Sequence, residues 1–200
     1  MPGLRETKKA ATKYLIAEQA AQILLNDGLD HLTVANIAAA ANVSPRTFHN
    51  YFPSRAVALT FFLQKNVRDM AKTMTGLIED GHSLLDSIEI LISNALKGDQ
   101  SQVDSFVSLF RVASALNTFE QATSRKVFSD ALSAGLEDAG IGKDLSEWER
   151  FVILNLSAQA GALSSSWYKE HPDEDVDDLV KRTFKVLREG TDTIRRARGH

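Results

Sequence analysis

The chain has 200 residues, of which 44% are hydrophobic and 24% are charged, and its formal net charge at pH 7 is −3. This length and apolar content are enough to bury a core and to form one or two compact domains. The chain has no cysteine, which excludes disulfides and thiol catalysis, and it has no apolar run long enough to span a membrane. Together with the lack of a secretory leader, this composition predicts a cytoplasmic protein with no membrane segment.

Apolar residues recur at helical spacing through almost the whole chain, and no segment has the clear alternation of a strand. The first helix is predicted from about Lys8 to Asp27, where Gly28 ends it. Two short helices follow within residues 33–52, and a long helix then runs from Ser54 to about Thr75. We therefore expect an all-α protein.

Five more helices are predicted in the rest of the chain, at residues 83–97, from Ser101 onward, from Thr118 to about Ala139, at 146–169 and at 173–196. Ser83 with Asp86, and Ser146 with Glu149, have the spacing of capping boxes, in which two residues satisfy each other's free backbone amides. The acidic residues at 173–178 suit the N-terminus of the last helix better than a metal site or an acidic tail. The total is nine helices.

The two short helices within residues 33–52 carry the most specific pattern in the chain. Thr33 can cap the first helix, and Asn42 with Val43 forms the turn, because asparagine tolerates a left-handed backbone. Ser44 can cap the second helix, and Pro45 occupies its first position, where a missing N–H has no cost. This pattern predicts a helix-turn-helix.

The second short helix is predicted to show a polar face to DNA while Phe48 and Phe52 anchor it to the core. Arg46 can donate two hydrogen bonds to guanine, and the neighbouring polar side chains can reach base edges or phosphates. The alternative is a helical hairpin with an ordinary solvated face. The predicted DNA-binding residues are Thr33, Ser44, Pro45, Arg46, Thr47, His49, Asn50, Tyr51 and Arg55.

Charge is distributed unevenly along the chain. Residues 1–68 have eight Lys or Arg and four Asp or Glu, a net charge of +4, and the remainder has 15 and 22, a net charge of −7. A basic first third on an acidic chain suits a protein that touches nucleic acid through one end. The early cations Arg5, Lys8, Lys9 and Lys13 either bind phosphates or belong to a solvated helix start.

The segment from Thr33 to Ser54 resembles the TetR family of bacterial transcriptional regulators. The resemblance rests on Thr33-Val34, Ile37-Ala38, Ala41, Val43-Ser44, Thr47-Phe48, Tyr51-Phe52 and Pro53-Ser54. Three positions depart from the family pattern: Asn42 replaces a turn glycine, His49 replaces an aromatic residue that contacts phosphate, and Arg55 replaces a lysine. The resemblance implies a three-helix DNA-binding domain at residues 1–70 and an effector-binding and dimerisation domain at 71–200.

The last two predicted helices, 146–169 and 173–196, suit self-association. Their apolar positions either close the core of a single chain or pair two chains, and the resemblance implies a homodimer through these two helices. A twofold dimer presents two recognition helices to a palindromic double-stranded DNA operator. The residues concerned are Leu156, Ala160, Gly161, Leu163, Ser164 and Trp167 in the first of the two helices, and Val176, Leu179, Val180, Phe184, Leu187 and Ile194 in the second.

Aromatic residues between positions 83 and 155 could line an apolar pocket for a small-molecule effector, although aromatics at helical spacing are more often ordinary core. The predicted lining residues are Phe106, Phe110, Asn117, Phe128, Trp148, Phe151 and Asn155.

Catalysis is not expected, because the histidines lack metal-ligand spacing and no nucleophile or phosphate-loop motif occurs. We predict no cofactor and no metal. The function that follows is a repressor released from its operator by a largely apolar effector. Two alternatives stay open, a constitutive DNA-binding protein without effector and an all-helical interaction or carrier module.

Overall fold

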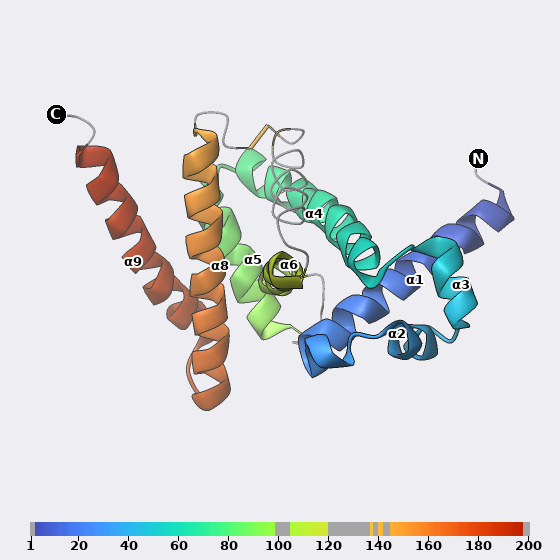
Figure 1. Ribbon diagram of the computed structural model, residues 1–200. Coiled ribbons are helices and arrows are strands. Elements are labelled where there is room, and N and C mark those ends of the chain that lie inside the picture. Colours follow the sequence, from blue (N-terminus) through green and yellow to red (C-terminus); the bar gives the residue numbers. More distant parts are fainter. Residues whose placement is uncertain (1–2, 99–104, 120–136, 138–139, 142–144, 198–200) are drawn as a thin grey trace. The chain divides into compact units, whose positions relative to one another are not determined.

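A computed structural model describes residues 3–98, 105–119, 137, 140–141 and 145–197 (Figure 1). Within these ranges the chain forms eight α-helices and one short 3-10 helix, and no strand. The predicted all-α fold is therefore confirmed. The ninth predicted helix, from Thr118 to about Ala139, and the predicted helix start at Ser101 lie largely outside the described residues.

The described residues form two compact units. The first contains residues 3–69 and 108–119, and the second contains residues 70–98, 105–107 and the described residues from 137 onward. Two helices, α4 (Arg55–Glu79) and α6 (Phe106–Phe119), continue from one unit into the other. The sequence predicted one boundary, at residue 70. The structure has a second boundary between the units, inside α6, that the sequence did not predict.

The first unit is built on α1 (Leu4–Asp27), which buries one face rich in alanine, including Ile16, Ala17 and Ala20. It begins four residues before the predicted Lys8, because good helix formers continue to Leu4 and the amides of Glu6 and Thr7 bond to the Gly3 carbonyl. The predicted end is confirmed. Gly28 has φ +86°, and its N–H donates to the Ile23 carbonyl at 3.1 Å.

Helix α4 packs in the first unit through buried side chains at helical spacing, among them Leu59, Phe62 and Leu63. The Tyr14 hydroxyl of α1 donates to Asn66 Oδ1 at 3.2 Å, while the Asn66 amide donates to the Phe62 carbonyl. The helix runs past the predicted end at Thr75, continues through Gly76 to Glu79, and is followed by Gly81, whose φ is +94°.

In the second unit, α8 (Glu147–Glu170) places small residues against its neighbours. A Cβ added at Gly161 would lie 2.8 Å from both Ile92 Cδ1 of α5 (Leu84–Lys97) and Val107 Cγ2 of α6. Ala160 and Ser164 are buried beside it, and the Ser164 hydroxyl donates to Thr183 of α9 (Val176–Ala197). These small residues of α8 therefore pack inside the single chain, which was one of the two interpretations left open by the sequence.

Helix α9 packs on α5 and α8 through Val176, Leu179, Val180 and Phe184, all of which are buried. These four side chains belong to the core of the single chain, which was one of the two interpretations left open by the sequence.

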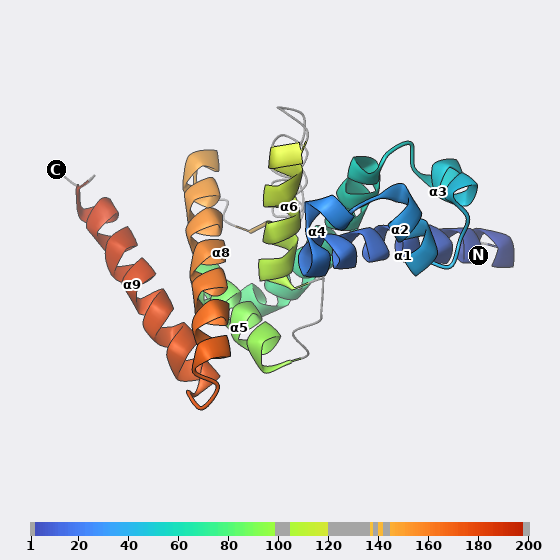
Figure 2. The same cartoon turned by 60° about the horizontal axis from the view of Figure 1, so that its bottom comes forward.

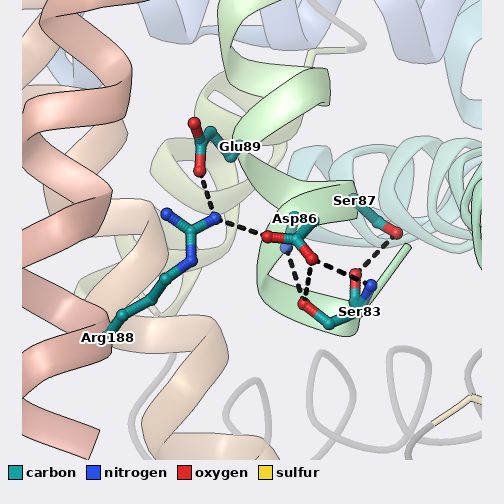
Figure 3. A network of polar contacts seen from close by, with 5 residues as sticks. All are labelled: Ser83, Asp86, Ser87, Glu89 and Arg188. Carbon is teal, nitrogen blue, oxygen red and sulfur yellow. Dashed lines mark hydrogen bonds and ion pairs between the residues drawn. The ribbon is translucent and has the colours of Figure 1, made fainter. Parts of the chain in front are cut away.

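Polar contacts fix the direction and register of α9 on α5. Near the start of α9, Asp177 accepts hydrogen bonds from Ser93 and Lys97, which lie near the end of α5. Three turns further along α9, Arg188 binds two carboxylates near the start of α5, Glu89 and Asp86, the latter at 2.5 Å (Figure 3). The two helices are therefore antiparallel, and a slip of one turn would lose both sets of contacts.

Asp86 belongs at once to this contact and to the cap of α5. Its carboxylate accepts from the Ser83 hydroxyl at 2.7 Å and from the Ser83 amide at 3.1 Å, and its own amide donates back to the Ser83 hydroxyl (Figure 3). The pKa of the Asp86 carboxyl lies below its ordinary value of 3.8, first because of the hydroxyl and then because of the Ser83 amide and the Arg188 guanidinium, although partial burial opposes the shift.

This lowered pKa predicts a pH-dependent stability. Because the folded pKa lies below the unfolded one, the stabilisation is complete above the unfolded pKa and is lost as pH falls through the folded pKa. At pH 7, Asp86→Asn should lower the free energy of unfolding by at most about 1 kcal/mol, because the side chain is 40% exposed and its ion pair is screened. In urea unfolding followed by circular dichroism, the difference from the wild type should shrink from about pH 5 to below about pH 3. A difference that stays constant over this range would contradict the assignment.

Candidate DNA-binding surface

Helix α2 (Val34–Ala40) is held in place by a side-chain cap and by a turn that the sequence predicts correctly. The Thr33 hydroxyl accepts from the Asn36 amide at 3.1 Å, as expected of an N-cap. After the helix, Asn42 has φ 52°, and the Val43 N–H donates to the Ala38 carbonyl at 2.8 Å. The left-handed residue turns the chain sharply, so that a second helix begins only a few residues later.

The second helix, α3 (Pro45–Tyr51), is short and depends on its cap and its anchors. Ser44 accepts from the Thr47 amide at 3.0 Å, and Pro45 occupies the first helical position. Phe48 and Phe52 are buried, with ring centroids 6.1 Å apart. Figure 2 shows α3 following α2 at the outer edge of this unit. Burial of the two rings fixes which side of α3 faces outward.

The side of α3 opposite the two phenylalanines is polar. Arg46, His49 and Asn50 are exposed, as are Ser44 and Pro45 at the start of the helix. Thr33, Thr47 and Tyr51 are half-buried, and the Thr47 hydroxyl lies 2.8 Å from the Ser44 hydroxyl. The exposed set combines a guanidinium, an imidazole and an amide, which are the groups that read base edges and hold phosphates.

Arg55 differs from the other predicted DNA-binding residues. Its guanidinium donates to the Leu32 carbonyl, 23 residues earlier in the sequence, and the residue is half-buried. It thereby ties the start of α4 to the segment before α2. The sequence predicted a phosphate contact and missed this structural bond, because nothing local to Arg55 indicates Leu32 as a partner.

The basic residues at the start of α1 also divide into two groups. Arg5, Lys8 and Lys9 are exposed. Lys13 is half-buried, with its ammonium 4.3 Å from the centre of the Phe61 ring and 5.5 Å from that of Phe52. Lys13 therefore stabilises the aromatic cluster behind α3 through a cation–π contact, and only the first three suit a phosphate backbone.

The described residues among those predicted to bind an effector differ in exposure. Phe106 is buried and Phe110 half-buried, but Trp148 and Phe151 are 59% and 57% exposed, and the Asn155 amide donates to the Phe151 carbonyl. The side chain of Asn117 and all of Phe128 lie outside the described residues. Trp148 and Phe151 lie off the buried face of α8, which consists largely of small residues such as Ala158 and Gly161.

Comparison with known proteins finds a family match for the segment around α2 and α3. The family profile described as "Bacterial regulatory proteins, tetR family" matches residues 16–57, the segment that contains α2, the turn and α3. The HTH-type transcriptional regulator TcmR of Streptomyces glaucescens is 43% identical over 60 residues, which are 30% of this chain and 26% of TcmR. Residues 16–57 therefore match the DNA-binding segment of the TetR family. In this segment the chain is similar to DNA-binding transcriptional regulators.

Two further comparisons extend beyond the helix-turn-helix. The HTH-type transcriptional repressor DhaR of Mycobacterium sp. (strain GP1) is 26% identical over 189 residues, covering 90% of this chain and 93% of DhaR. The structure of the transcriptional regulator FadR from Bacillus subtilis in complex with stearoyl-CoA is 17% identical, with a TM-score of 0.53, and covers 86% of this chain and 96% of FadR. At this identity FadR shows the shared fold alone.

Two negative findings apply to the described parts of the chain. Among the helices described, none is long and apolar enough to cross a membrane. In the same residues, no group of three or more His, Asp or Glu side chains could hold a metal ion.

The exposed position of Arg46 predicts a loss of DNA affinity without a loss of fold. Arg46→Ala should weaken binding to the preferred DNA sequence about 10- to 100-fold and relax the preference at one base pair, because a base contact is removed. Fluorescence anisotropy with specific and scrambled duplexes measures both effects, and Arg68→Ala on α4 is a control with another exposed arginine. Wild-type affinity and sequence preference in the Arg46 variant would refute this assignment of the reading face.

Proposed function

We propose that this protein is a dimeric repressor that binds a palindromic operator through α3 and leaves it when a small, largely apolar effector binds the second unit. The observation that carries the proposal is the outward polar face of α3, with Arg46, His49 and Asn50 exposed above the buried Phe48 and Phe52. Such a regulator acts at the chromosome, which places it in the cytoplasm.

A dimer through α8 and α9 is supported by large apolar side chains that the single chain leaves in water. On α8, Leu163 is 68% exposed, and Leu156 and Trp167 lie seven residues before it and four after it, on the same helix face. On α9, Val186 is 70% exposed. A row of this kind over two neighbouring helices is typical of an interface. Regulators of this family act as dimers, and a twofold axis suits a palindromic operator.

Acyl-CoA molecules are the first effector class to test. The proposal rests on the fold shared with FadR of Bacillus subtilis, whose structure contains stearoyl-CoA. An acyl chain has the apolar surface that we expect of the effector. Release from DNA then requires the effector to bind one conformation of the protein more tightly than the DNA-bound conformation. A thousandfold loss of operator affinity corresponds to about 4 kcal/mol.

Selection of bound fragments from the source genome tests the proposed function directly. Purified protein should enrich a small number of fragments that share a palindrome, with an affinity that falls as salt rises. Stearoyl-CoA and shorter acyl-CoAs are then added to the bound fragment. Release by any of them supports the effector class, whereas specific binding that no acyl-CoA weakens favours a constitutive DNA-binding protein. A protein that enriches no fragment is not an operator-binding repressor.

Leu163 offers a test of the dimer interface. Leu163→Glu should raise the dimer dissociation constant by about 100-fold or more, because an unpaired carboxylate would be buried between the chains. Sedimentation velocity measures the dissociation, and binding of the palindrome should weaken with it. Leu15→Glu, at an exposed leucine of α1, is the matched control and should remain dimeric. A dimeric Leu163→Glu protein would place the interface elsewhere.

A further inference from the structure

Three exposed cations lie close together at the start of α1. Arg5, Lys8 and Lys9 belong to the first two turns of this helix, and all three are exposed. Their spacing of three and four residues places them on one face of the helix. Within the described residues, none of the three side chains forms an ion pair or a hydrogen bond. Packing and pairing inside the fold therefore do not account for them.

The positions of these cations are unfavourable for the helix itself. The backbone dipole gives the N-terminus of a helix a partial positive charge, so acidic residues stabilise the first turn and cations do not. Here the only acidic residue of the first turn is Glu6. Arg5 and Lys9 are four residues apart, so their like charges also repel each other. The three cations lower the stability of the first turns, and what they contribute must lie outside the fold.

Contacts within the first unit place the start of α1 beside α3. Lys13, one turn after Lys9, lies with its ammonium 5.5 Å from the centre of the Phe52 ring at the end of α3. Because a helix rises about 1.5 Å per residue, Lys9 lies about 6 Å and Arg5 about 12 Å from Lys13 along the axis. Figures 1 and 2 both show the start of α1 at the same end of this unit as α3.

A helix that enters the major groove lies between two sugar-phosphate backbones. The groove is only about 12 Å wide, so side chains that extend beyond one end of α3 meet the phosphates at its border. Double-stranded DNA carries about one negative charge per 1.7 Å of its axis. Residues 3–17 contain four Lys or Arg and one acidic residue, so the charge of this segment is complementary to that border.

We propose that Arg5, Lys8 and Lys9 form a second DNA-binding surface, the α1 cation face, which binds the phosphate backbone beside the groove that α3 occupies. Phosphate contacts carry no sequence information, so the α1 cation face strengthens binding to every duplex alike. The inference rests on the proposed binding of DNA through α3 and adds a surface that lies outside α2 and α3.

The test compares the full-length wild type with a triple variant that has Arg5→Gln, Lys8→Gln and Lys9→Gln. Fluorescence anisotropy at several salt concentrations gives the affinity for the selected operator fragment and for a scrambled duplex. Each lost phosphate contact lowers the slope of log affinity against log salt by about 0.9, so the slope should fall by about 2 to 3 on both duplexes. At about 0.1 M salt both affinities should fall about 10- to 100-fold, with their ratio unchanged.

A second triple variant, with Lys169→Gln, Lys181→Gln and Lys185→Gln, is the matched control. It removes three exposed lysines from α8 and α9 and so loses the same net charge. Its slope should change by less than about 0.9, the value of one phosphate contact. Glutamine is a good helix former, and its introduction at Arg5 and Lys9 removes a repulsion, so the α1 variant should melt no lower than the wild type.

The outcomes separate this surface from the repressor function. If the wild type selects no operator but the α1 variant lowers the slope on the scrambled duplex, the repressor function fails and the α1 cation face stands. If the operator is bound and the α1 variant keeps the wild-type slope, the repressor function stands and the α1 cation face is refuted. It is refuted equally by a changed ratio of the two affinities, or by equal losses in the two triple variants.

Discussion

The burial of Phe48 and Phe52 is the constraint on which the DNA-binding surface depends. A helix of seven residues is too short to be stable in water by itself, so α3 exists because its two rings enter the core and because Ser44 caps it. Once one side of α3 is fixed, helical geometry fixes the other, and Arg46, His49 and Asn50 must face outward. The reading surface is thus a consequence of packing behind it, to which Lys13 contributes by lying over the rings of Phe52 and Phe61.

The second unit uses a different combination of forces. Small residues of α8, with Gly161 the closest contact, let that helix approach α5 and the start of α6, and large apolar residues such as Leu163 and Trp167 lie on its outer side. The main apolar face of α9 packs in the core of the single chain. Asp177 and Arg188 align this helix on α5. The surface left for a partner is therefore narrow, consisting of the outer side of α8 and a few positions such as Val186.

Local features could be predicted from the sequence, and features that depend on distant partners could not. The caps at Thr33, Ser44, Ser83 and Ser146 are confirmed because each involves residues three positions apart, and the backbone of Asn42 follows from its own side chain. The bond of Arg55 to Leu32 spans 23 residues, and that of Arg111 to Leu25 spans 86. Within the described residues periodicity predicted the helices correctly, but it could not tell which side of α8 faces inward.

The two helices shared by the units are tied to α1 by bonds of unequal strength. Asn66 of α4 is buried, and separating it from Tyr14 would leave polar groups without partners, at a cost of about 1–3 kcal/mol. Arg111 of α6 is exposed, so water can replace the Leu25 carbonyl at little cost. The Tyr14–Asn66 bond therefore holds α4 to α1 more firmly than the Arg111–Leu25 bond holds α6.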